Sequence, residues 1–124
     1  MLNRDLVQRH LATYQKAWQR QDPDLILSIF TSDAAYHERT FDQPYVGHEA
    51  IRHYWQTKVV ATQANIDFRL LHLYIDGDVA IAEWEASFDD RERNMRRKIQ
   101  EVAILEFRGA LIQSLREYWH GTEA

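Results

Sequence analysis

The hydrophobic period of the chain changes near residue 66, and this change constrains the fold more than any other feature of the sequence. Apolar side chains follow helical spacing through residues 3–21, whereas residues 66–75 and 78–88 alternate between apolar and polar side chains with a period of two. The dipeptide Asp76-Gly77 separates these two segments, and it tolerates the positive φ angles of a tight hairpin turn. The chain is therefore predicted to place helices before an antiparallel sheet.

The first half of the chain is predicted to contain three helices and one strand. Residues 3–21 form the first, amphipathic helix. Asp22-Pro23 begins a short second helix, because proline suits the first helical turn. Residues 33–39 then form a strand, and the third helix follows a loop that closes at Gly47.

Two further strands complete the predicted sheet. One runs from about residue 96 to residue 107, and the last follows a turn at Arg108-Gly109 and ends at Trp119. The expected element order is therefore helix, helix, strand, helix and four antiparallel strands. This order predicts a single α+β domain over residues 1–124, with the helices on one face of the sheet.

The predicted hairpin leaves apolar side chains on both faces of the sheet. If its turn is the two residues Asp76-Gly77, Leu70 lies opposite Glu83, and each face of the hairpin carries both apolar and polar side chains. One face packs on the helices, and the other needs a cover. A homodimer through the outer sheet face is the economical explanation, and scattered surface apolar residues are the alternative. We expect the homodimer.

The composition excludes several classes of protein. The 124 residues include no Cys, which removes disulfide frameworks, thiolate zinc sites and cysteine nucleophiles. No segment resembles a signal peptide or a membrane span, so we expect a cytoplasmic chain with no membrane partner. The net charge of -4 gives no general attraction for nucleic acid, and no nucleic-acid partner is expected.

No metal or cofactor is expected from the motifs of the sequence. His48 and His53 lie five residues apart, which turns them away from each other on a helix, whereas metalloprotease histidines lie four apart. The sequence also lacks a glycine-rich phosphate loop and a Gly-x-Ser-x-Gly motif. Nucleotide binding and serine hydrolysis therefore have no support.

Aromatic residues are more informative than the histidines. Tyr14 and Trp18 lie one turn apart on the first predicted helix, Tyr54 and Trp55 lie on the third, and Trp119 ends the last strand. Tyr and Trp keep a polar atom that needs a partner when they are buried. Such a cluster suits the lining of an amphipathic ligand pocket as well as a hydrophobic core.

Several segments, in this order, are similar to the nuclear transport factor 2-like superfamily and its SnoaL-like branch. They are YQKAWQRQDPDLILSIFTSDAAYHE, QPYVGHEAIRHYW, VAIAEWEASF and VAILEFRGALIQSLREYWH, and they span nearly the whole chain. The resemblance implies a cystatin-like cone, in which three helices and a curved antiparallel sheet surround a pocket. The branch includes polyketide cyclases and many members without known activity, so the resemblance is specific for fold rather than for function.

A distant similarity to ketosteroid isomerase, a member of this superfamily, implies roles for individual residues. The oxyanion-hole tyrosine of that enzyme falls on Tyr14, and its general-base aspartate falls on Glu38. Its third catalytic group, a protonated aspartic acid, falls on Ala103, so one oxyanion donor is missing. Tyr14 and Glu38 are therefore the candidate catalytic residues.

The same alignment turns one set of strand residues towards the pocket. Glu83, Glu85 and Glu101 then face inward, and the acidic pocket favours a polar or cationic ligand. A bulge that shifts the register by one residue instead turns Trp84 inward and leaves Glu83 and Glu85 in solvent. Both registers remain open.

Two functions follow from these observations. The first is a small-molecule-binding protein that, as an enzyme, performs cofactor-free proton transfer of the isomerase, cyclase or dehydratase type. The alternative is a non-catalytic ligand-binding or dimerisation module. The candidate ligand-binding residues are Trp18, Tyr36, Tyr54, Trp55, Glu83, Glu85, Glu101, Ala103 and Trp119.

Overall fold

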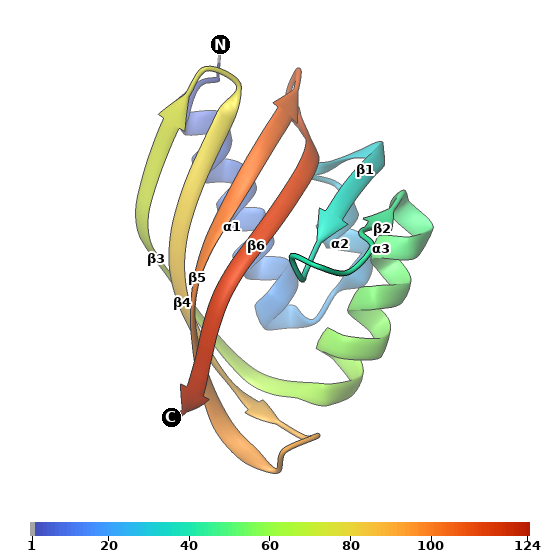
Figure 1. Ribbon diagram of the computed structural model, residues 1–124, viewed down its shortest axis with the longest axis vertical. Coiled ribbons are helices and arrows are strands. Elements are labelled where there is room, and N and C mark those ends of the chain that lie inside the picture. Colours follow the sequence, from blue (N-terminus) through green and yellow to red (C-terminus); the bar gives the residue numbers. More distant parts are fainter. Residues whose placement is uncertain (1) are drawn as a thin grey trace.

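The computed structural model describes residues 2–124, and its helices lie on one side of a curved sheet (Figure 1). The α-helices are α1 (Arg4–Arg20), α2 (Pro23–Leu27) and α3 (His48–Tyr54). A π-helical segment, η1 (Trp55–Val60), continues α3 without a break. None of these helices is long and apolar enough to cross a membrane.

Six strands form one sheet. They are β1 (Phe30–His37), β2 (Tyr45–Val46), β3 (Gln63–Asp76), β4 (Val79–Asp90), β5 (Met95–Arg108) and β6 (Leu111–Glu123). Their order across the sheet is β2-β1-β6-β5-β4-β3. The α+β class expected from the sequence is confirmed.

The sheet differs from the prediction in two respects. β1 pairs with β6 in parallel, so the sheet is mixed rather than wholly antiparallel. The two-residue strand β2, which pairs with β1, was not predicted and adds a strand to the expected element order. The alternation of apolar residues does not reveal the direction of pairing between distant strands, and two residues are too few to show a period.

The helix starts are fixed by the side chains that the sequence places there. Asn3 caps α1, because its side-chain oxygen accepts a hydrogen bond from the Asp5 amide at 2.7 Å. Asp22 caps α2 in the same way, accepting from the amides of Asp24 and Leu25. Pro23 follows at a position where the missing N–H has no cost.

The β3–β4 hairpin has a different register from the one predicted. Asp76 pairs with Val79, so the turn residues are Gly77, at a φ of 62°, and Asp78. The register then shifts between Leu70 and His72, as in a β-bulge. Leu70 consequently lies opposite Trp84 instead of Glu83.

This register decides which side chains of β4 enter the core. The inward residues of β4 are Ala80, Ala82, Trp84, Ala86 and Phe88, and all are buried. Small alanines on both sides of Trp84 leave room for its ring, which lies 5.0 Å from the Tyr14 ring and 5.4 Å from the Phe68 ring, centroid to centroid. The core therefore sits between α1 and the inner face of the sheet.

The prediction that Glu83 and Glu85 face the pocket is wrong. Both lie on the outer face, where Glu83 contacts His72 at 2.7 Å and Glu85 lies 3.5 Å from the Arg69 guanidinium and 3.8 Å from the Lys98 ammonium. The alternation of β4 leaves them no inward position once Trp84 is in the core. The register with inward Trp84, left open by the sequence, is the one observed.

Candidate functional site

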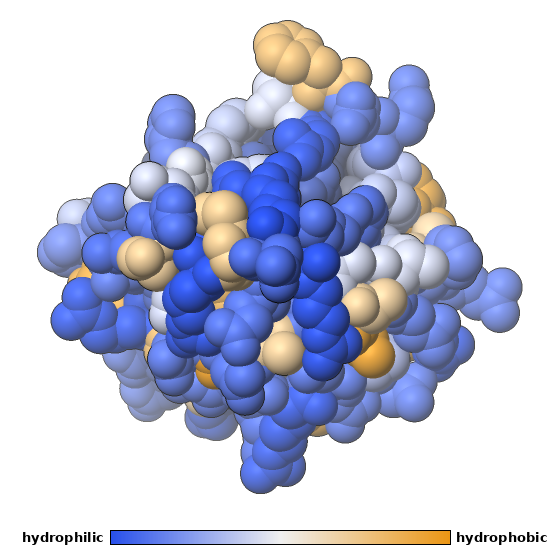
Figure 2. Space-filling model, turned by 90° about the horizontal axis from the view of Figure 1, so that it is seen from below, coloured by the Kyte–Doolittle hydropathy of each residue, from blue (hydrophilic) through white to orange (hydrophobic). Residues whose placement is uncertain are grey.

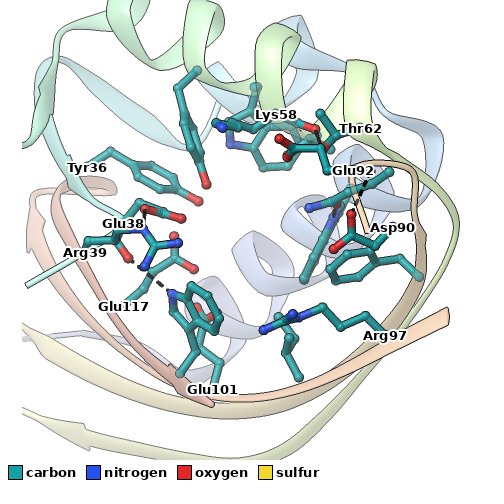
Figure 3. A pocket seen from close by; sticks show the side chains of 18 of the residues that line it. Tyr36, Glu38, Arg39, Lys58, Thr62, Asp90, Glu92, Arg97, Glu101 and Glu117 are labelled. Carbon is teal, nitrogen blue, oxygen red and sulfur yellow. Dashed lines mark hydrogen bonds and ion pairs between the residues drawn. The ribbon is translucent and has the colours of Figure 1, made fainter. Parts of the chain in front are cut away.

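A cavity of about 640 Å³ lies between the helices and the inner face of β5 and β6 (Figure 3). Aromatic rings form much of its wall: Tyr14, Trp18, Tyr36, Tyr45, Tyr54, Trp55, Phe88 and Trp119. Seen from below, the surface at this end of the molecule is mostly hydrophilic, with hydrophobic side chains scattered over it (Figure 2). The size and lining are typical of a site for a small organic molecule.

The structure brings most of the predicted site residues to this cavity. Those that line it are Tyr14, Trp18, Tyr36, Glu38, Tyr54, Trp55, Glu101 and Trp119. Ala103 does not line it, although its side chain is buried on the inner face of β5. Glu83 and Glu85 lie on the opposite face of the sheet, as described above.

Two carboxyl groups are buried in the cavity wall. Glu101 of β5 is 2% exposed and Glu117 of β6 is 8% exposed (Figure 3). Burial raises the pKa of both groups, and the charge of Glu117 together with its hydrogen bonding raises the pKa of Glu101 further. Two carboxylates this deeply buried and this close cannot both be charged at low cost, so we expect the pair to hold one proton, with Glu101 as the protonated member.

Tyrosine hydroxyls extend this pair towards α1. Tyr14 Oη and Tyr36 Oη are 3.2 Å apart and share a hydrogen bond. Burial raises the pKa of Glu117, while hydrogen bonding from Glu101 and from the Tyr36 hydroxyl lowers it. Burial also raises the pKa of Tyr14 and of Tyr36 well above 10, so both stay protonated and remain hydrogen-bond donors. The hydroxyls and carboxyls thus form one polar network in the cavity wall.

Three polar atoms of the cavity residues have no hydrogen-bond partner among the described residues. They are Glu101 Oε2, Glu117 Oε1 and Trp55 Nε1. Buried polar groups in proteins are nearly always paired, and the exceptions are frequent at functional sites. Unpaired buried polar atoms are costly, so these three atoms mark the wall formed by Glu101, Glu117 and Trp55 as a candidate functional site.

Glu38 lies directly after β1 and contributes another carboxyl group to the cavity wall. Burial raises its pKa, while the charges of Arg39 and Lys58 lower it. Glu38 forms an ion pair with Arg39 at 3.2 Å. Its backbone carbonyl accepts a hydrogen bond from Trp119 Nε1 at 3.3 Å, which joins the end of β1 to β6.

Sequence reasoning missed Glu117, although a signal for it exists. Leu115 is buried on β6, and a period of two from Leu115 places Glu117 and Trp119 on the same inner face. Asp90 and Arg97, near the tip of the β4–β5 hairpin, also line the cavity and were not among the predicted site residues. Within residues 2–124, no group of three His, Cys, Asp or Glu side chains is arranged to hold a metal ion.

The model of the SnoaL-like domain matches residues 8–115, which is most of the chain. No protein with a curated description matches the chain.

Solved structures with the same fold are numerous, and all three described below are less than 25% identical to the chain. The epoxide hydrolase/cyclase-like enzyme SalBIII, of pyran ring formation in the polyether salinomycin, has a TM-score of 0.83 and 21% identity, with 100% of each chain covered. TsrD from Streptomyces laurentii has a TM-score of 0.80 and 17% identity, covering 96% of this chain and 91% of the other. A hypothetical protein with a ketosteroid isomerase-like fold from Catenulispora acidiphila, solved with trimethylamine, has a TM-score of 0.78 and 19% identity, covering 88% and 83%.

Proposed function

Because the chain belongs to the SnoaL-like family, we propose that it binds a small organic molecule in the aromatic cavity and catalyses a cofactor-free proton transfer on it. The reaction type is that of an isomerase, cyclase or dehydratase. One observation carries the proposal: the buried pair Glu101 and Glu117 borders the cavity and each has an oxygen without a partner. Carboxyl groups with raised pKa values in a cleft suit acid–base chemistry near neutral pH.

The position of Glu117 compensates for the acid that Ala103 lacks. Ala103 and Glu117 lie directly opposite each other on β5 and β6, so their Cβ atoms are close neighbours on the inner face. Alanine at position 103 leaves the space that the Glu117 side chain occupies. A carboxyl group therefore reaches the cavity from the strand next to Ala103.

The proposed mechanism divides the chemistry among three groups. The Glu38 carboxylate takes a proton from the substrate. The protonated carboxyl of the Glu101–Glu117 pair donates a proton or hydrogen bond to a substrate oxygen, and the Tyr14 hydroxyl stabilises the charge that develops there. Tyr14 is linked to this pair through Tyr36, so the tyrosine hydroxyl and the protonated carboxyl belong to one hydrogen-bonded network that donates to the substrate oxygen.

A thermal-shift screen followed by turnover measurements tests this function. We expect polyketide-like compounds with polar or cationic groups to raise the melting temperature, because they bind the folded state. On the substrate that this screen identifies, Glu38→Gln and Tyr14→Phe are each expected to lower turnover by about 10²-fold or more with little change in melting temperature. Wild-type turnover in both variants would contradict the mechanism, and binding without any turnover would favour the non-catalytic ligand-binding module.

We also propose that residues 1–124 form one domain that pairs with a second copy through the outer sheet face. Ile81 and Ile104 are cross-strand neighbours on that face, and Tyr118 beside them is 44% exposed. Light scattering is expected to give about twice the chain mass of 14.8 kDa, and Ile104→Glu is expected to give the monomer. Thr122→Glu, near the end of the same face, is the control, and a wild-type mass of one chain would contradict the dimer.

A further inference from the structure

We propose that Arg97 and Arg39, both placed on the Trp119 ring at the rim of the cavity, form a binding subsite for an organic anion. The inference rests on the proposed function and names its ligand class. The ligand is an amphipathic molecule that carries a carboxylate or a similar anionic group at one end. Its uncharged or cationic end then lies deeper, towards Glu101 and Glu117.

The pairing of the charges in the cavity wall, rather than their sum, supports an anion at the rim, because six acidic and four cationic side chains line the cavity but two of the cations have no acidic partner within residues 2–124. Four cationic side chains line the cavity: Arg39, Lys58, Arg93 and Arg97. Arg93 pairs with Asp90 at 2.9 Å, and Arg39 pairs with Glu38. Among the residues described, no carboxylate lies within ion-pair distance of Arg97 or Lys58. A guanidinium is seldom placed in a partly buried site without an acidic partner unless a ligand supplies the negative charge.

The geometry places two guanidinium groups beside one indole ring. The Cζ atom of Arg39 lies 5.1 Å from the centroid of the Trp119 ring, and that of Arg97 lies 5.8 Å from it. Contact with the ring face stabilises each cation and limits its freedom. Figure 3 shows Arg39 and Arg97 reaching from opposite sides of the cavity. An anionic group at this rim is offered charge-assisted N–H donors by Arg97, and Arg39 on the same ring adds positive charge.

Gly121 leaves the space in which the Arg97 guanidinium lies. Arg97 and Gly121 lie on the inner face of neighbouring strands, and a Cβ atom on Gly121 would lie 2.8 Å from Arg97 Cζ. Gly121 does not have a positive φ angle, so its backbone conformation does not require glycine. The absence of a side chain at Gly121 therefore gives the Arg97 guanidinium room to lie over this part of the backbone. Gly121 is a positioning residue in this account.

The two ends of the cavity then have opposite preferences, which orients the ligand. The buried carboxyl pair excludes an anion from the deep end, because even a singly ionised pair repels it across a medium of low dielectric constant. The rim attracts the anion through Arg97. An amphipathic anion therefore enters with its uncharged end first, and its reacting group meets Glu101 and Glu117.

A matched pair of fluorescent probes tests this subsite. 8-Anilinonaphthalene-1-sulfonate and N-phenyl-1-naphthylamine share one aromatic skeleton and differ by the sulfonate. We expect the wild-type chain to bind the sulfonate at least about tenfold more tightly in a fluorescence titration, since the anion adds charge-assisted hydrogen bonds. The preference is expected to shrink when the salt concentration rises from about 0.05 M to about 0.5 M, because salt screens exposed charges.

Three variants locate the effect. Arg97→Gln is expected to abolish the preference for the sulfonate, and Gly121→Ala is expected to reduce it by displacing the same guanidinium. Arg91→Gln is the matched control, because Arg91 lies on the same hairpin, is exposed and does not line the cavity. It should keep the full preference.

The outcomes separate the subsite from the proposed function. Equal binding of both probes by the wild-type chain, or a preference that survives Arg97→Gln, overturns the subsite and leaves the ligand cavity standing. Failure of both probes to bind overturns both, because the uncharged probe needs only the aromatic cavity.

Discussion

Glu117→Gln is expected to lower turnover by about 10²- to 10⁴-fold, because the substitution removes the group that shares a proton with Glu101. Glutamine has nearly the same shape, so the cavity keeps its form. The measurement is the turnover number on the substrate identified by the ligand screen. Glu83→Gln is the matched control, since Glu83 lies on the outer face and is expected to have no role in turnover. Similar activity in both variants would contradict the account.

The same substitution is expected to change how stability depends on pH. The pKa of Glu101 and that of Glu117 are raised in the folded chain from an ordinary value of 4.5. The folded state therefore binds more protons than the unfolded state above about pH 4.5, and stability falls as pH rises through the raised pKa values. Glu117→Gln should flatten this fall and exceed the wild type in melting temperature at about pH 8, but not at about pH 4. An equal pH dependence in both proteins would show that the pair is not perturbed.

Trp84→Ala is expected to lower the free energy of unfolding by about 3–5 kcal/mol, the usual cost of removing a large buried aromatic side chain. Trp84 is fully buried, packs on Tyr14 and Phe68, and does not line the cavity. The neighbouring alanines Ala82 and Ala86 are too small to fill the space. Urea unfolding followed by circular dichroism measures the loss.

Trp119→Ala is the comparison for this variant. Trp119 is only partly buried at the rim of the cavity, so its removal should cost clearly less stability and should instead weaken binding of an anionic probe. A loss below about 1 kcal/mol for Trp84→Ala would contradict the observed register of β4.

The sequence predicted most elements of the fold, because their signals are local. The caps Asn3 and Asp22 and the long amphipathic face of α1 needed no tertiary context. The resemblance to the nuclear transport factor 2-like superfamily and its SnoaL-like branch is confirmed by the family match. The parallel pairing of β1 with β6 could not be predicted, since these strands are more than 70 residues apart. The alternation of apolar and polar residues in a strand does not identify the strand with which it pairs.

The site was harder to predict, because it depends on register. The register shift between Leu70 and His72 places Trp84, rather than Glu83 or Glu85, opposite Leu70 on the inner face. The aromatic positions Tyr14, Tyr36 and Trp55 were less sensitive, since Tyr and Trp were expected to face inward in any arrangement of the elements. Glu117 was overlooked, although a period of two from the buried Leu115 places it on the inner face of β6.

A ¹³C NMR titration of the glutamate carboxyl carbons tests the central claim, that Glu101 and Glu117 form a buried pair holding one proton. Glu101→Gln and Glu117→Gln assign the two signals. The account predicts that one carboxyl of the pair titrates with a pKa well above 4.5, and that removing its partner lowers this pKa. Two carboxyls that both titrate at or below 4.5, unaffected by each other's removal, would contradict it.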